Sequence, residues 1–147
     1  MPIEQTAVSA APYVRSIVRI VVALLFLEHG LSRLFGWPSP LPTPPMLSMY
    51  WFAGAIELCG GILLGLGLFT RPAAFVMSGE MAFAYFLSHA PRGFFPILNG
   101  GDGAILYCFI FLYLAFAGPG PWSLDAMWRR RAERSAGEAP RFAQRQV

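Results

Sequence analysis

Residues 49–69 read MYWFAGAIELCGGILLGLGLF and carry a single charged side chain, Glu57. A helix needs about 20 consecutive apolar residues to cross the hydrocarbon core of a bilayer, and this stretch has that length. A helix of a soluble bundle would instead show a broad polar face with a period of about 3.6 residues. Residues 49–69 have no such face. The pattern therefore predicts a transmembrane helix and argues against a soluble four-helix bundle.

Three further apolar segments surround this one, at about residues 17–35, 72–89 and 103–118. The last two are at or below the usual length of a membrane span. A proline-rich loop at residues 36–45 separates the first two segments, because such a run of prolines cannot lie inside a helix. We therefore expect an all-α fold, a polytopic membrane bundle of four helices.

The predicted organisation has three parts. Residues 1–13 form an N-terminal cytoplasmic segment, residues 14–128 hold the four transmembrane helices, and residues 129–147 form a basic cytoplasmic tail. The tail is expected to be disordered, because a polar, highly charged segment cannot bury enough apolar surface to fold.

Composition supports a membrane location. Hydrophobic residues make up 56% of the chain and charged residues 13%, against about 45–50% and about 25% in soluble domains. The net charge of +3 includes eleven arginines, six of them after residue 128, so the basic excess is not spread over a surface and does not indicate nucleic acid binding. Cys59 and Cys108 have no zinc or redox spacing.

The arginines also predict an orientation. Arg15 and Arg19 lie at the start of the first segment, Arg71 follows the second, and the tail holds six more. Arg33 and Arg92 fall on the opposite side. The positive-inside rule then places both termini in the cytoplasm, and we expect a multi-pass protein of the inner (plasma) membrane.

Ionisable side chains inside the predicted spans are the candidate site residues, because such groups are costly in a membrane. With a rise of about 1.5 Å per residue, Glu28 and His29 lie roughly 9–10 Å below the outer end of their helix. Glu57 and Glu80 lie roughly 12–13 Å deep in theirs. Three helices thus place ionisable groups in one thin layer. Three more candidates are expected above it, near the outer surface: Arg33, His89 and Asp102.

Glycines follow Glu57 along one face of its helix. Gly54, Glu57, Gly61 and Gly65 are spaced by three and four residues, which places them on one side. Small residues let a neighbouring helix approach closely. Gly54, Gly61 and Gly65 are therefore predicted packing positions, and Glu57 is predicted to face another helix.

The polar layer has three interpretations. It could hold the helices together through polar contacts worth about 0.6–2 kcal/mol each, bind the head group of a quinone or similar ligand, or conduct protons. A buried carboxyl group without a partner tends to stay protonated, so at least one of Glu28, Glu57 and Glu80 is expected to be neutral at pH 7. The residue types assign no catalytic side chain.

The two histidines do not indicate haem or a metal. Haem ligated by two histidines needs both rings on facing helices at matched depth. His29 is expected inside the membrane and His89 at its surface. No cofactor is required by the sequence, although a quinone is compatible with it.

Four motifs follow one another in a fixed order: EHGLSRLFG at residues 28–36, ELCGGILLGLGLFTR at 57–71, NGGD at 99–102 and GPGPWSLD at 118–125. Together they resemble the DoxX family of small bacterial membrane proteins. Arg33 stands where lysine is more usual in that family, and Asp102 stands where glutamate is more usual. The resemblance implies a four-helix membrane bundle. Relatives in that family are linked to quinone-reducing sulfur oxidation and to membrane-associated oxidoreductase assemblies.

Three functions follow as hypotheses. The first is an accessory or anchoring subunit that docks a protein partner in a redox-linked membrane complex. The second is a catalytic, quinone-interacting oxidoreductase subunit, in which Glu28, His29, Glu57 and Glu80 would supply hydrogen bonds and protons. The third is a proton-coupled transporter of a small molecule, which four helices would form more readily as a homo-oligomer.

Overall fold

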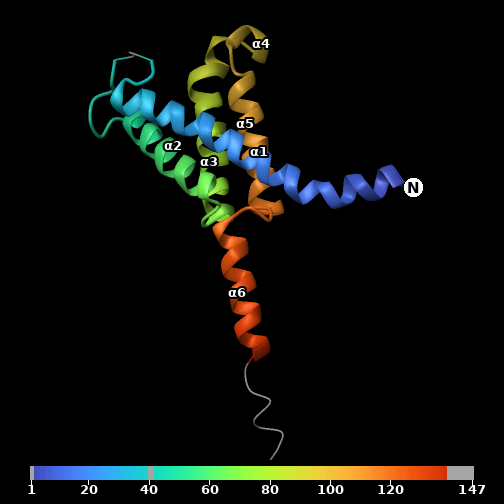
Figure 1. Cartoon of the computed structure of the whole chain (residues 1–147). Helices are drawn as coiled ribbons and strands as arrows, with labels where there is room; N and C mark the ends of the chain where they lie inside the picture. The colour runs from blue at the N-terminus through green and yellow to red at the C-terminus, as the bar shows by residue number, and fades with distance from the viewer. Residues whose placement is uncertain (1, 40–41, 139–147) are drawn as a thin grey trace, which may run out of the picture.

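The computed structural model describes residues 2–39 and 42–138, and these form helices and connecting loops only. The predicted all-α class is confirmed. The body of the molecule contains α1 (Pro2–Phe35), α2 (Met49–Leu66), α3 (Thr70–Ala84) and α5 (Asp102–Ala117), as Figure 1 shows. Shorter elements complete the chain: a π turn η1 (Tyr85–His89), a 3-10 turn η2 (Ala90–Arg92), α4 (Pro96–Asn99) and the final helix α6 (Leu124–Glu138).

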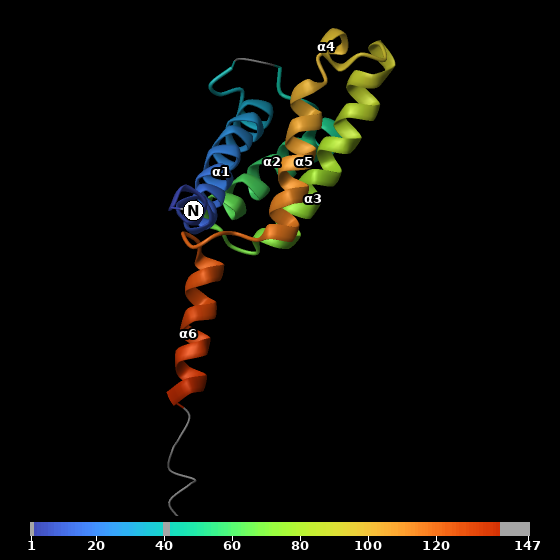
Figure 2. The same cartoon turned by 90° about the vertical axis from the view of Figure 1, so that its right-hand side faces the viewer.

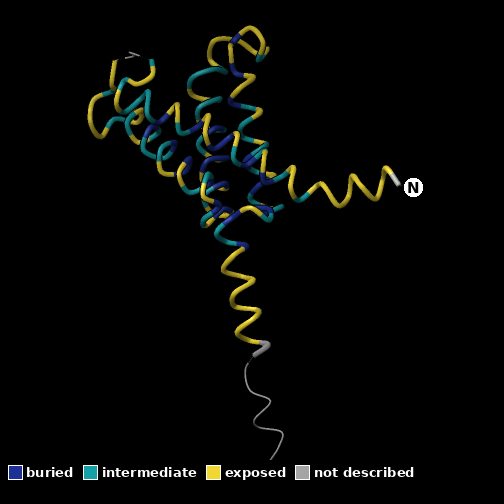
Figure 3. The backbone as a smooth tube through the Cα atoms, viewed as in Figure 1, coloured by how far each residue is buried: buried dark blue, intermediate teal, exposed yellow. Residues whose placement is uncertain are grey.

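The body consists of two helix pairs. Helix α1 packs along α2, and α3 packs along α5, whereas α2 and α3 touch over a shorter length. We call the end with the α2–α3 turn (residues 67–70) and the connection at residues 118–123 the closed end. The opposite end is the open end. The N-terminal part of α1 and most of α6 extend away from the body (Figures 1 and 2). Residues 3–11 of α1 and 127–136 of α6 are exposed, whereas the first turn of α6 packs against the closed end (Figure 3).

The core lies where the two pairs meet. The rings of Phe26 and Phe111 pack edge to face with centroids 4.6 Å apart, and Phe26 makes a second edge-to-face contact with Tyr107 at 5.0 Å. Leu64 of α2 and Met77 of α3 are fully buried in the same cluster. Such aromatic pairs contribute about 0.5–1.5 kcal/mol beyond the area they bury, so this cluster helps to fix how the pairs cross.

Glycines allow α1 and α2 to touch. A Cβ at Gly30 would lie only 2.6 Å from the backbone nitrogen of Leu58, and one at Gly61 would lie 3.0 Å from the α1 backbone. Gly54 faces α1 side chains at similar range, while a Cβ at Gly65 would have its nearest neighbour at 3.9 Å. The glycine face of α2 therefore packs against α1, most tightly at its centre.

The closed end is tied together by backbone caps. Gly67 adopts a left-handed conformation with φ 67°, and its N–H donates to the carbonyl oxygen of Leu64 at 3.1 Å, which ends α2. The carboxylate of Asp125 accepts hydrogen bonds from the N–H groups of Phe69 at 3.0 Å and Thr70 at 2.9 Å. Asp125 thus caps the start of α3 from a distant part of the chain.

The first helix is longer than predicted. It begins at Pro2, not near residue 17, so the separate segment predicted at residues 1–13 is helical from Pro2 onward. Alanines at positions 7, 10 and 11 favour this extension, because alanine has the highest helix propensity. Glu4 lies in the first turn, where a negative charge is favourable.

The predicted disorder of the basic tail is wrong for residues 129–138, which belong to α6. Residues 139–147 lie outside the described residues. Helix α6 forms because Ser123 caps it: the Ser123 hydroxyl accepts the N–H of Ala126 at 3.1 Å. Arginine and alanine, which dominate the following turns, are also strong helix formers.

The prediction of four membrane spans is only partly supported. Residues Ile3–Phe35 and helix α2 are long and apolar enough to cross a membrane, while α5 is apolar but shorter. Large apolar side chains nevertheless cover the outside of all four body helices: Leu24, Phe52, Phe83 and Phe109 are each at least 50% exposed. Such surfaces indicate lipid or protein contact rather than water.

Candidate functional site

Four of the seven predicted site residues line one cavity at the open end. This inner cavity has a volume of about 230 Å³. His29 and Arg33 reach it from α1, Glu57 from α2 and His89 from η1. Its other walls include the core residue Phe26. The fold therefore brings polar residues from three elements into one space.

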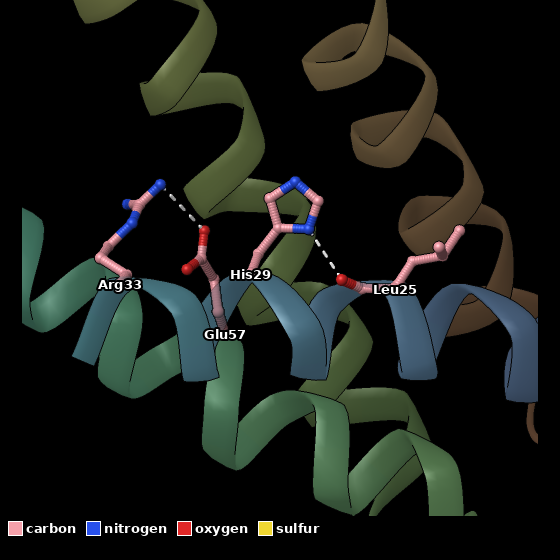
Figure 4. A network of polar contacts seen from close by, with 4 residues as sticks. All are labelled: Leu25, His29, Arg33 and Glu57. Carbon is pink, nitrogen blue, oxygen red and sulfur yellow. Dashed lines mark hydrogen bonds and ion pairs between the residues drawn. The ribbon is translucent and has the colours of Figure 1, made fainter. Parts of the chain in front are cut away.

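Arg33 and Glu57 form an ion pair between α1 and α2 (Figure 4). Nη2 of Arg33 lies 3.3 Å from Oε1 of Glu57, whose side chain is only 2% exposed, against 33% for Arg33. Glu57 shares its helix face with Gly54 and Gly61, and the tight contact of that face with α1 brings it to Arg33. Removing one partner of a buried ion pair typically costs about 3–5 kcal/mol.

The imidazole of His29 is oriented by its own helix (Figure 4). Its Nδ1 lies 2.7 Å from the carbonyl oxygen of Leu25. A carbonyl oxygen can only accept, so Nδ1 carries a hydrogen. Nε2, which is an acceptor whenever the ring is neutral, has no hydrogen-bond partner among the described residues. The ring meets Tyr107 edge-on, with centroids 6.4 Å apart. The inner cavity thus holds a hydrogen-bond acceptor in a defined orientation.

A larger hollow, the α2–α3 groove, lies between the first half of α2 and the second half of α3. Its volume is about 640 Å³, and Phe52, Ile56 and Phe83 give it apolar walls. Glu80 lines the groove, and both of its carboxylate oxygens are buried without a hydrogen-bond partner among the described residues. Glu80 is therefore the carboxyl group that best fits the expectation of a neutral side chain.

The groove and the inner cavity meet at two residues, since Arg33 and His89 line both. His89 reaches this point through the π turn η1, a type of irregularity that often occurs at functional sites. Its Nδ1 lies 3.1 Å from the carbonyl oxygen of Asn99 and 3.1 Å from Nη2 of Arg92. One neighbour accepts and the other donates, so Nδ1 can satisfy only one of them at a time.

Glu28 and Asp102 do not join this group. Glu28 is exposed and lines neither hollow, because one residue along α1 turns its side chain about 100° away from His29. Asp102 is exposed in the first turn of α5, where a carboxylate is favourable at the helix N-terminus. Both histidines line the inner cavity, although they were predicted at different depths.

Two residues with structural or site contacts were missed by the sequence reasoning. Tyr107 lines the inner cavity. Tyr107 follows Ala104 by three residues and precedes Phe111 by four. This spacing predicts that the three side chains share one face of the helix, turned toward the core. Arg19 was assigned only to orientation, but it is fully buried. No sequence pattern distinguishes such an arginine from one that marks the membrane surface.

Arg19 instead binds the closed end together. Its Nε donates to the carbonyl oxygen of Pro119 at 2.9 Å, and its Nη1 donates to that of Gly65 at 2.9 Å and to that of Leu64. Its Nη2 donates to the carbonyl oxygen of Trp122. The guanidinium therefore satisfies carbonyl groups at the end of α2 and in the connection at residues 118–123.

Comparisons with known proteins agree on a family. The DoxX family model matches residues 14–90. An uncharacterized protein of Haemophilus influenzae is 48% identical, with 78% of this chain and 90% of that protein covered. An uncharacterized membrane protein of Mycobacterium tuberculosis is 27% identical, with 78% and 81% covered. No solved structure matches.

Proposed function

The chain belongs to the DoxX family of membrane proteins, and we propose that it binds the head group of a lipid-soluble quinone as a subunit of a redox-linked complex. The observation that best supports this proposal is that the α2–α3 groove meets the inner cavity at Arg33 and His89. An apolar slot that ends on a few convergent polar groups is the usual form of a small-molecule site. We place it in the inner membrane, with four spans and cytoplasmic termini.

The groove suits the apolar part of such a ligand. Its volume of about 640 Å³ falls within the range of about 300–1,000 Å³ that is typical of small-molecule sites. The outer surfaces of α2 and α3 carry exposed apolar side chains such as Phe52 and Phe83. If these surfaces face lipid, a lipid-soluble molecule can enter the groove directly from the bilayer.

The polar groups match both redox forms of the head group. The carbonyl oxygens of a quinone accept hydrogen bonds, and the Arg33 guanidinium donates them. The hydroxyl groups of the reduced quinol donate, and Nε2 of His29 accepts. Reduction of a quinone takes up two electrons and two protons. His29 and Glu80 would exchange the protons, and a partner subunit would supply the electrons.

The two exposed extensions favour an accessory subunit over a catalytic one that acts alone. Residues 3–11 of α1 and residues 127–136 of α6 are exposed and lead away from the body (Figure 3). They offer surfaces to a protein partner without involving the packed helices. A catalytic subunit would instead reduce quinone when purified.

The site can be tested by isothermal titration calorimetry. The experiment measures the binding of a short-chain ubiquinone analogue to the full-length protein in lipid nanodiscs. Arg33→Gln is expected to weaken binding at least about tenfold, since a hydrogen bond to a charged group contributes about 1.5–3 kcal/mol. Gly79→Phe gives an independent test. Gly79 lines the groove and a Cβ there has no neighbour within 4 Å, so the ring should fill the groove without moving the backbone.

Glu28→Gln is the matched control, because it alters a carboxyl group of the same helix outside both hollows. It should bind the analogue as the unaltered protein does. Equal affinity in the unaltered protein and in Arg33→Gln and Gly79→Phe would refute the quinone site. If the purified protein reduces quinone with an artificial electron donor, the result would instead favour the hypothesis of a catalytic subunit.

A further inference from the structure

A third hollow lies at the closed end, remote from the proposed quinone site. It has a volume of about 300 Å³ and is lined by Arg71, Pro119, Asp125, Trp128 and Arg129. These residues come from the start of α3, from the connection at residues 118–123 and from the first turns of α6. Figure 2 shows this connection leading into α6 below the body.

Arg71 is held in place but has donors to spare. Its Nη1 donates to the carbonyl oxygens of Ala115 at 3.1 Å and Phe116 at 2.8 Å, which fixes the guanidinium over the end of α5. Nε and Nη2 have no acceptor among the described residues. A guanidinium held by one nitrogen presents its remaining N–H groups in the planar fork that suits a phosphate.

The one acidic residue of this hollow is already engaged. Both oxygens of Asp125 accept backbone N–H groups, from Phe69 and Thr70. It forms no ion pair with Arg71 or Arg129, since the one ion pair among the described residues joins Arg33 and Glu57. The hollow therefore contains two positive charges, on Arg71 and Arg129, and one negative charge, on Asp125. Its net charge is positive.

Arg129 supplies the second cation. It is exposed and makes no hydrogen bond or ion pair with the described residues. Arg130, the next residue, turns the other way and donates to the carbonyl oxygen of Pro121 at 3.3 Å. Arg129 is therefore available to a ligand that enters beside Arg71.

Aromatic side chains indicate the depth of this hollow in a membrane. Trp122, Trp128 and Tyr13 are 54%, 52% and 50% exposed, and the rings of Tyr13 and Trp122 meet edge-on with centroids 5.7 Å apart. Exposed tryptophan and tyrosine gather at the level of lipid head groups. The hollow thus lies where lipid phosphates lie, and basic pockets at this level bind anionic lipids.

We propose that the hollow between Arg71 and Arg129 binds the phosphate group of an anionic phospholipid, with Trp128 beside the head group. This site is independent of the quinone proposal, because it shares no lining residue with the α2–α3 groove or the inner cavity. A bound lipid would bridge α3 and α6 and so hold α6 against the body.

The test is titration of the delipidated full-length protein in neutral detergent with phosphatidylglycerol, followed by native mass spectrometry. We expect saturable binding that Arg129→Gln weakens about fivefold or more, the effect of one arginine near an anionic lipid surface. Arg134→Gln is the matched control. It removes the same charge from the same helix outside the hollow and should leave the affinity unchanged.

Three outcomes would overturn the proposal. Equal weakening by Arg129→Gln and Arg134→Gln would show diffuse attraction between α6 and anionic lipid. Binding of inorganic phosphate as tightly as the lipid would show a site for a free anion. Binding of phosphatidylcholine as tightly as phosphatidylglycerol, or no saturable binding of either, would remove the preference for anionic lipid.

Discussion

Arg19 at the closed end and Arg33 at the open end of the helix body are used in opposite ways. At the closed end, Arg19 is fully buried, and its guanidinium donates to carbonyl groups of α2 and of the connection at residues 118–123. At the open end, Arg33 meets one carboxylate, that of Glu57, and a third of its side chain remains exposed beside two hollows. A buried charged group stabilises the fold when protein groups satisfy all of its hydrogen bonds. A charged group that keeps unpaired donors or acceptors can bind a ligand.

The carboxylates show the same contrast. Asp125 at the closed end accepts two backbone N–H groups and caps a helix. Glu80 at the open end is buried without a hydrogen-bond partner among the described residues. The presence of charge in an apolar helix therefore does not identify a site by itself. The number of unsatisfied donors and acceptors around each charge separates Arg19 and Asp125 from Arg33 and Glu80.

The largest effect is expected from Arg19→Met. The change leaves several buried carbonyl groups without donors, at about 1–3 kcal/mol each, so the protein should lose at least about 3 kcal/mol of stability. Thermal unfolding in mild detergent, followed by size-exclusion chromatography, measures this loss. Arg134→Met on the exposed face of α6 is the control. If Arg19→Met and Arg134→Met unfold at similar temperatures, the structural role assigned to Arg19 is wrong.

A smaller effect is expected from Gly30→Ala. The added Cβ would lie 2.6 Å from the Leu58 backbone nitrogen, so α1 and α2 must separate. Overpacking of this kind costs about 1–3 kcal/mol, of which about 1 kcal/mol can be offset by the higher helix propensity of alanine. Gly79→Ala is matched, since its Cβ meets nothing within 4 Å. The same melting assay should show loss for Gly30→Ala and none for Gly79→Ala.

Glu80→Gln sharpens the comparison without a large change in stability. We expect Glu80 to carry a proton at pH 7, because its buried oxygens have no donor among the described residues. Infrared difference spectroscopy should then show the carbonyl band of a protonated carboxylic acid, which Glu80→Gln removes. Absence of that band from the unaltered protein at neutral pH would contradict this assignment.

The smallest effects are expected from Glu28→Gln and Asp102→Asn. Both side chains are exposed and line neither hollow at the open end. Stability should change by less than about 0.5 kcal/mol, as for most surface substitutions. Binding of the quinone analogue should not change. A tenfold loss in either variant would extend the site beyond the two hollows.

The candidate site could be predicted from the sequence where a helical repeat carried the information. Glycine spacing on one face of α2 placed Glu57 against another helix, and the structure places it beside Arg33 of α1. Counting residues along straight helices placed Glu80 deep and His89 near the surface, and both depths stay predictions. The count assumed a regular helix up to His89, where the chain forms a π turn.

The fold was less predictable where distant segments meet. Asp125 caps a helix that begins 55 residues earlier in the chain, and Arg19 binds carbonyl groups 100 residues away. Neither contact leaves a local pattern. Helix α6 had local signals, a capping serine and good helix formers, but its high charge resembles that of disordered tails. A charged segment can remain helical when its first turn is anchored to a folded body, as Asp125 anchors α6.

The π turn η1 has a genetic consequence. The N–H of Ala90 donates to the carbonyl oxygen of Tyr85, five residues back, where an α-helix would use four. The turn therefore contains one residue more than regular helix requires. Loss of a single codon between positions 85 and 88 would restore the regular step while leaving the direction of His89 relative to Glu80 nearly unchanged. One in-frame deletion would thus remove the irregular turn and keep the groove joined to the cavity.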